Sequence, residues 1–261
     1  MPELMTDHIF AIDGDRAIPT AWAAGPWSQE MMHGGAPAGL VVWAAEREPS
    51  PVPMRVARLT LEMMRPVPLV DLTIETEILR QGRKIQLCLV RLKAAGAVVC
   101  QGQVLRIREA DLADAERLVP LDVPLPDACE PSATRESSTN NFGAGYEMRR
   151  AYGGFGEIGP GAWWFHQKRA MIAGATSSPA MLAASAADFV NGVGSALPFD
   201  RWTFLNADLT VNFARAPRGE WILNKAESWI SADGAGVAMA RLADCDGYFG
   251  TATQSLVIEP R

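Results

Sequence analysis

Residues 33–48 read HGGAPAGLVVWAAERE, and this stretch decides the fold of the chain. Apolar residues such as Leu40, Val41 and Trp43 fall on almost every side of the helix that it would form. A helix that is apolar all round must be buried, so we expect a sheet to curl around it. Two glycines open the stretch, and three prolines between residues 49 and 53 end it.

Strand-like runs follow this helix, and the same order of elements then recurs. The first set of strands is predicted over residues 58–64, 72–80, 85–93 and 98–108, with turn residues between them. The later set is predicted over residues 142–152, 162–169, 203–215, 221–231, 237–242 and 248–258. Among these lies a second apolar helix at Ser177–Gly192, which Ser177 or Ser178 would cap with Pro179 in the first turn.

The two halves also align with each other at an offset of about 150 residues, as expected for an internal repeat. RLTLEMMRP at Arg58 lies over DLTVNFARA at Asp208, and Glu77 lies over Glu227. We therefore predict a duplicated α+β unit, with an N-terminal domain over residues 1–109 and a C-terminal domain over 141–261. Residues 110–140 are predicted to be an acidic linker laid over the surface, because they carry little periodicity.

Composition excludes several classes of protein. The chain has 261 residues, 48% of them hydrophobic, and a net charge of −6, which argues against a nucleic-acid partner. No run of apolar residues is long enough to span a membrane, and the N-terminus lacks a secretory signal, so we expect a cytoplasmic protein. The four cysteines and three histidines lack the spacing of a metal site or a disulfide framework.

Several motifs, in order, carry a resemblance to a known family. They are GPWSQEMMHGGAPAGL, RLTLEMMRPVPL, AADFVNG, RWTFLNADLTVNFAR, GEWI and GTATQSLVIEPR. Together they resemble the acyl-CoA thioesterase II family with its TesB-like members, from about Gly25 to Arg261 and excepting the linker. The resemblance implies a double hotdog fold, in which two tandem units each wrap a long antiparallel sheet around a central helix.

The resemblance also implies an activity and a site. The family hydrolyses acyl-CoA thioesters to a free acid and CoA, without metal or organic cofactor, using a water held by an Asp, a Gln and a Thr or Ser. Carried over position by position, these roles fall on Asp188, Gln254 and Asn206. Asn206 departs from the family because an amide replaces a hydroxyl, although an amide can also orient water.

The residues themselves agree with this assignment. Asp188 lies on an otherwise apolar helix, where an unpartnered carboxylate would be costly, so we expect it at a cleft or hydrogen-bonded. Gln254 interrupts a strand whose side chains could point inward beside Asp188. The alternatives are that Asp188 only caps or bridges a neighbouring strand, and that Asn206 and Gln254 are satisfied core amides.

The start of the first helix offers the other half of a site. Gly34 and Gly35 would let a ligand approach the free N–H groups and the positive end of the helix dipole, so we expect the thioester carbonyl there. The alternative is that both glycines only permit close packing. His33 is expected to contact the N-terminus of the helix or to bind substrate as a wall of the site, rather than to act as a base, since no carboxylate is evidently positioned to orient it.

Three other functions remain open. A non-hydrolytic acyl-CoA binding protein would account for the Asn206 departure. A hotdog dehydratase would need an Asp and His pair, and no histidine lies near Asp188 in the sequence. A purely structural duplication would have no small-molecule site.

The G-x-G-x-x-G of Gly154, Gly156 and Gly159 is followed by Pro160 and is predicted to be a loop, not a dinucleotide site. Exposed sheet edges favour a homo-oligomer.

Overall fold

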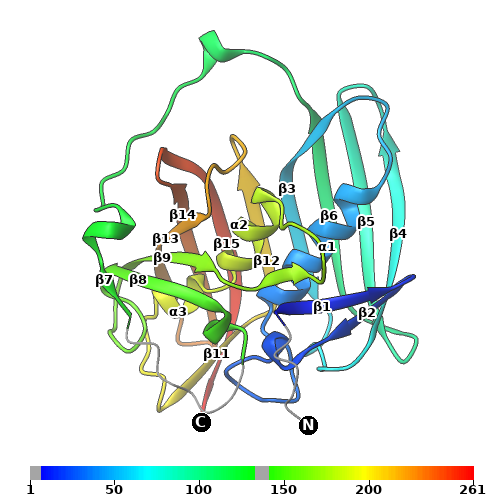
Figure 1. The fold of residues 1–261 in the computed structure, drawn as a ribbon. Coiled ribbons are helices and arrows are strands. Elements are labelled where there is room, and N and C mark those ends of the chain that lie inside the picture. Colours follow the sequence, from blue (N-terminus) through cyan, green and yellow to red (C-terminus); the bar gives the residue numbers. More distant parts are fainter. Residues whose placement is uncertain (1–6, 133–140) are drawn as a thin grey trace.

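The computed structural model describes residues 7–132 and 141–261, and these form one continuous sheet of 15 strands. Figure 1 shows two strongly curved halves, with the helices lying on the inner side of the sheet. The halves join in the middle, where β3 (Met54–Met63) pairs antiparallel with β12 (Asp208–Phe213). The predicted α+β architecture, a sheet wrapped around a helix made twice in one chain, is confirmed.

The N-terminal half holds the helix that the opening stretch predicts. This helix, α1 (Gly35–Arg47), buries ten of its thirteen residues, because the sheet surrounds it. The strands on which it lies are β4 (Leu72–Gln81), β5 (Ile85–Ala94), β6 (Ala97–Arg108) and β3. A hairpin of β1 (His8–Asp13) and β2 (Arg16–Pro19) continues the sheet, followed by the 3-10 turn η1 (Ala21–Ala23).

The C-terminal half repeats this order with more interruptions. Its helix is divided into α2 (Pro179–Ala187) and α3 (Val190–Val193), so the single helix predicted over Ser177–Gly192 is wrong at Asp188. Ser178 caps α2 by accepting a hydrogen bond from the Met181 N–H at 3.1 Å, and Pro179 opens it as predicted. The strands of this half are β8 (Tyr146–Tyr152), β9 (Gly161–Gln167), β10 (Ala170–Ile172), β11 (Trp202–Asn206), β12, β13 (Trp221–Ile230), β14 (Ala235–Asp244) and β15 (Gly247–Pro260).

The predicted strand over residues 203–215 is also interrupted, at Ala207. Three residues lie between Asn206 and Thr210, whereas only two lie between their partners Leu256 and Thr253 on β15. One extra residue in a strand is a bulge, which bends the strand and redirects the side chains beside it. The bulge lies opposite Gln254, and it sets the direction of Asn206.

The part of the linker that the structure describes lies partly on the outer face of the C-terminal sheet. Figure 1 shows this connection running from the end of β6 across to β7 (Glu130–Pro131), with the short turns η2 (Ala113–Ala115) and η3 (Pro126–Ala128) on the way. Asp122 accepts hydrogen bonds from Lys225 and Tyr248, which lower the pKa of its carboxyl to about 2. Residues 133–140 of the predicted linker lie outside the described residues.

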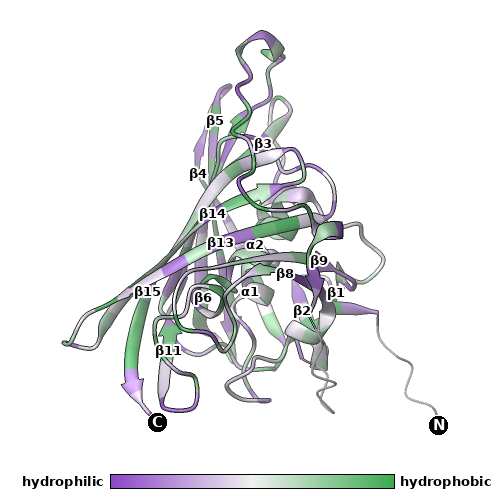
Figure 2. Cartoon of the chain, turned by 90° about the vertical axis from the view of Figure 1, so that its left-hand side faces the viewer, coloured by the Kyte–Doolittle hydropathy of each residue, from purple (hydrophilic) through white to green (hydrophobic). Residues whose placement is uncertain are grey.

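Side chains alternate between the two faces of the strands. Figure 2, turned by 90°, shows both hydrophobic and hydrophilic bands along β13. Along β13 the inward positions include Ile222 and Ala226, which are buried, and the outward positions include the exposed Glu227 and Trp229. The predicted loop at Gly154, Gly156 and Gly159 is confirmed, since all three glycines have positive φ and lie outside strands and helices. Within the described residues, no helix is long and apolar enough to cross a membrane.

Candidate active site

Asp188 lies where the second helix breaks, against the beginning of the first helix. It is the C-cap residue of α2, and only 4% of it is exposed. Its carboxylate is so close to Gly34, the N-cap residue of α1, that a methyl group added at Gly34 would lie 2.7 Å from Oδ2. The break in one helix and the start of the other therefore hold an acidic group from the C-terminal half against the N-terminal half.

Two amides donate to the same carboxylate oxygen. Asn206 Nδ2 lies 2.8 Å from Asp188 Oδ1, and Gln254 Nε2 lies 3.2 Å from it. Gln254 is 1% exposed, and its own Oε1 accepts the Asn191 backbone N–H at 3.1 Å. Asn206 comes from the end of β11 at the bulge, and Gln254 comes from β15. The structure therefore brings together the three residues that the resemblance singled out.

His33 contacts the other carboxylate oxygen. Its Nδ1 lies 2.9 Å from Asp188 Oδ2, with 9% of the imidazole exposed. The Gly35 N–H donates a hydrogen bond to the same Nδ1, at 3.1 Å, so this nitrogen lies between the start of α1 and the Asp188 carboxylate. The expectation that no carboxylate orients His33 is therefore wrong, because residues from the two halves meet only in the folded chain.

Gly34 and Gly35 are both places of close approach. A methyl group at Gly35 would lie 2.5 Å from the Ser185 carbonyl oxygen and 2.6 Å from the Phe142 ring. The packing reading of Gly35 is therefore supported by a direct contact between the two helices. Gly34 faces the Asp188 carboxylate instead, and as the N-cap residue it offers no side chain to the first N–H groups of α1. The N-terminal N–H groups of such a helix are the ones that lack intrahelical partners.

Aromatic side chains enclose the charged group. The His33 ring packs against both Phe142 and Phe189, with ring centroids 4.8 and 4.4 Å away. Burial raises the pKa of the Tyr146 phenol, and the nearby charge of Asp188 raises it further. Burial and Asp188 likewise raise the pKa of the Cys100 thiol. Both groups are therefore neutral near pH 7.

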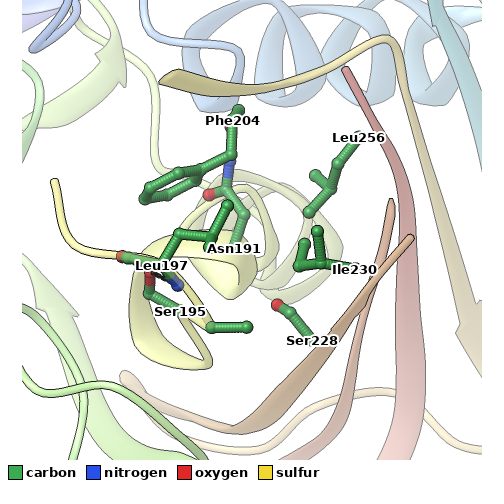
Figure 3. A pocket seen from close by; sticks show the side chains of 8 residues that line it. Asn191, Ser195, Leu197, Phe204, Ser228, Ile230 and Leu256 are labelled. Carbon is green, nitrogen blue, oxygen red and sulfur yellow. Dashed lines mark hydrogen bonds between the residues drawn. The ribbon is translucent and has the colours of Figure 1, made fainter. Parts of the chain in front are cut away.

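Sequence reasoning missed Asn191. Its backbone N–H fixes Gln254, and its Nδ2 donates to the Phe204 carbonyl at 3.1 Å, so it connects α3 to both strands that supply the amides. It also lines a small pocket between α3 and the inner face of β13, β11 and β15 (Figure 3). Its position three residues after Asp188, in DFVN, is the signal that could have identified it.

Comparison with known proteins identifies the family. One family model, the acyl-CoA thioesterase N-terminal domain, matches residues 23–107, and a second, the acyl-CoA thioesterase C-terminal domain, matches residues 126–258. This chain belongs to the acyl-CoA thioesterase family. It is a thioester hydrolase of that family, and the expected resemblance is confirmed. A search of curated proteins found no match.

Solved structures show the same fold at low sequence identity. A suggested thioesterase from Novosphingobium aromaticivorans is 23% identical, with a TM-score of 0.71 over 95% of this chain and 98% of that one. A hot dog protein from Alicyclobacillus acidocaldarius is 17% identical, with a TM-score of 0.74 over 96% and 95%. The tesB protein of Mycobacterium avium subspecies paratuberculosis is 14% identical, with a TM-score of 0.70 over 96% of each chain. The double hotdog fold is therefore confirmed.

The described residues hold no group of three or more His, Cys, Asp and Glu side chains that could bind a metal ion. All four cysteines are free.

Proposed function

We propose that this acyl-CoA thioesterase hydrolyses fatty acyl-CoA to a free fatty acid and CoA, with a water molecule that Asp188 activates. One observation carries the proposal: the Asp188 carboxylate is held by three side chains, from β11, β15 and the segment before α1, directly beside the N-terminus of α1. A general base needs a fixed direction toward the proton that it removes, and an ester-like carbonyl needs donors for the charge that develops.

In this mechanism, Asp188 takes a proton from the water as its oxygen attacks the thioester carbonyl carbon. Asn206 and Gln254 hold the carboxylate through Oδ1 and orient the water. The carbonyl oxygen becomes negative and accepts hydrogen bonds from the Gly34 N–H and from the Gly35 N–H, which gives up its bond to His33 Nδ1 when the substrate binds. The carbon–sulfur bond then breaks, and the CoA sulfur leaves with the proton that Asp188 had accepted.

His33 is proposed to bind substrate and to position Asp188. Its Nδ1 lies 2.9 Å from Asp188 Oδ2 and accepts the Gly35 N–H, so it connects the carboxylate to the start of α1. Its ring stacks on Phe142 and is tilted by 45° against Phe189, and these two contacts limit rotation of the imidazole. No cofactor takes part in these steps, which use only side chains, backbone amides and water.

The Asp188→Asn substitution tests the proposal. Release of free thiol from acyl-CoA should fall by about 10² to 10⁴ in kcat, the range for loss of a general base. Asp200→Asn, at an exposed aspartate in the loop after α3, is the matched control and should retain activity. Tight saturable binding of acyl-CoA without any turnover by the unmodified chain would instead establish the non-hydrolytic alternative.

A second candidate function rests on the contact between His33 and Asp188. A hotdog dehydratase needs an Asp and His pair, and the pair that the sequence did not place together is 2.9 Å apart. Mass spectrometry of the products from 3-hydroxyacyl-CoA separates the two activities. A dehydratase would yield the enoyl thioester with the CoA still attached, whereas the proposed thioesterase yields the hydroxy acid and free CoA.

We further propose a homo-oligomer. An outward apolar stripe crosses neighbouring strands of the C-terminal sheet, where Leu205 pairs with Val257 and Trp229 pairs with Val237. Trp229 is 59% exposed and Val257 is 49% exposed, which is costly in water unless a second copy covers them. Light scattering of the unmodified chain and of Trp229→Lys would test this, and a monomer at all concentrations would contradict it.

The remaining proposals concern the arrangement and location of the chain. We propose a division into domains 1–109 and 141–261 with linker 110–140, which the two separate family matches support. We propose a cytoplasmic location, supported by the four free cysteines, since disulfides are rare in reducing compartments. No membrane or nucleic-acid partner is part of the proposed function.

A further inference from the structure

A small pocket lies one hydrogen bond away from the proposed active site. Asn191 forms part of its wall and holds Gln254 through its backbone N–H, at 3.1 Å. Phe204 forms another part and precedes Asn206 by two residues on β11. The pocket therefore neighbours the proposed active site through Asn191 and Phe204.

The pocket is apolar except for three polar residues. Its lining consists of Asn191, Ser195, Ala196, Leu197, Phe204, Ser228, Ile230 and Leu256. Asn191 Nδ2 is bonded to the Phe204 carbonyl, and Ser195 Oγ donates to the Leu197 carbonyl at 2.8 Å. Both groups are therefore satisfied by the protein itself, and the rest of the lining suits a hydrocarbon chain.

Ser228 is the exception. Its Oγ is buried and has no hydrogen-bond partner within the described residues. Figure 3 shows this side chain extending from β13 toward Ser195 and Ile230, into the pocket. A buried hydroxyl normally has a hydrogen-bond partner, so one without a partner in the protein requires an explanation. The pocket is narrow as its side chains now stand, and a ligand enters it only if its walls separate.

We propose that this pocket takes the acyl chain of the substrate, and that Ser228 selects a chain carrying a hydroxyl or oxo oxygen. The inference rests on the proposed function, because it places the thioester carbonyl at Asp188. Binding requires the loop residues Ser195 and Leu197 to move away from β13 and β15. The oxygen substituent then forms the hydrogen bond that Ser228 lacks, while Ile230 and Leu256 contact the methylene groups.

The test uses acyl-CoAs of equal chain length. Hexanoyl-CoA is compared with 3-hydroxyhexanoyl-CoA and with the 4-oxo and 5-oxo analogues, and kcat/KM is measured from thiol release after subtraction of the uncatalysed rate. We expect one oxygenated isomer to exceed hexanoyl-CoA by about tenfold, the order of one buried hydrogen bond. In Ser228→Ala this ratio should fall to about one. The matched control is Ser255→Ala, on the outer face of β15, which should keep the ratio.

A second variant tests the pocket independently of the hydroxyl. Ile230→Ala shortens one side chain of the wall and so enlarges the pocket. Since one methylene in an apolar pocket changes selectivity by about 10- to 200-fold, the ratio of kcat/KM for octanoyl-CoA to that for hexanoyl-CoA should rise at least tenfold. The proposal is overturned if no oxygenated isomer is preferred, or if the preference survives in Ser228→Ala.

These outcomes are separate from those of the proposed function. Hydrolysis without any preference refutes only the role of Ser228, and the hydrolytic mechanism stands. Absence of all hydrolysis refutes the mechanism, and the same panel is then compared by calorimetric binding to the unmodified chain and to Ser228→Ala. In that comparison a preferred isomer, lost on substitution, supports the pocket, and equal dissociation constants overturn it.

Discussion

Gly34→Ala should disable the site while leaving the backbone undisturbed. Gly34 has φ −60° and ψ −21°, a helical conformation that alanine adopts readily, so the substitution causes no backbone strain. The added methyl group would lie 2.7 Å from Asp188 Oδ2 and 2.8 Å from Oδ1, where ordinary contacts begin at 3.4 Å. The carboxylate would therefore have to move by at least about 0.7 Å, a lower limit set by that contact distance.

This displacement acts on the group that the proposed mechanism uses as its base. Moving the carboxylate stretches its hydrogen bonds to Asn206, Gln254 and His33, because all three come from other elements that do not move with it. Misplacement of a reacting group by about 1 Å costs about 10² in rate. We expect kcat/KM to fall by about 10², which is about 2.7 kcal/mol of transition-state stabilisation.

Stability should change much less than activity. Replacing glycine by alanine where the backbone fits stabilises a protein by about 0.4–1 kcal/mol, which offsets part of the strain in the carboxylate. The expected shift of Tm is therefore no more than about 4 °C for a chain of this size. The measurements are thiol release from acyl-CoA and thermal unfolding on the same preparations.

Gly145→Ala is the matched control. Gly145 also lacks a positive φ, and a methyl group there would meet only Arg169 Cγ, at an ordinary 3.7 Å. This variant should retain full activity. If Gly34→Ala kept kcat/KM within about threefold of the unmodified chain, the reasoning that places Asp188 in contact with the start of α1 during catalysis would be wrong.

Three further substitutions have defined outcomes. Asn206→Ala removes one of the two amide donors to Asp188 and should lower kcat/KM by about 10- to 100-fold, the effect of one hydrogen bond to a charged group, with Asn206→Thr retaining more activity. Burial raises the pKa of Glu46 above its ordinary 4.5, so the folded chain binds the carboxyl proton more tightly than the unfolded chain does. The free energy of unfolding therefore falls as the pH rises from 4.5 through the folded-state pKa. Glu46→Gln should remove that fall, seen by urea unfolding between pH 4.5 and 7.5. Burial alone would raise the pKa of Asp244, but hydrogen bonds from Arg215 and from two backbone N–H groups outweigh burial and lower it. The ionised Asp244 therefore stabilises the fold above pH 3.8, and this stabilisation is lost as the pH falls through the folded-state pKa. Asp244→Asn should cost about 3–5 kcal/mol at pH 7, measured by the same method, because it leaves the Arg215 charge without its partner.

Much of the fold follows from local patterns. The apolar helix of residues 35–47 is fixed by its composition and by the prolines after it, and the start of α2 is fixed by Ser178 and Pro179. These signals act over one or two turns of chain, so they can be recognised in the sequence alone. Alternation of apolar residues likewise identified the long strands. The parallel pairing of β1 with β10, which joins residues far apart in the chain, had no such signal.

The candidate site could be predicted only in part from the sequence, and the rest required the tertiary structure. The sequence, through the resemblance, singled out Asp188, Asn206 and Gln254, but it predicted Asp188 inside a continuous helix and Asn206 inside a continuous strand. The structure ends the helix at Ala187 and places a bulge at Ala207. Both interruptions are set by contacts with β15, which no local pattern contains.

The sequence by itself determined which residue types are present and which segments form helices and strands, because hydrophobic periodicity, caps and prolines act between near neighbours. Only the tertiary structure decided that His33 and Asp188 meet, that Asn191 holds Gln254, and that the Ser228 hydroxyl lies buried without a partner among the described residues. Each of these depends on distances between segments far apart in the chain, and those distances are fixed by the packing of the two helices and the curvature of the shared sheet.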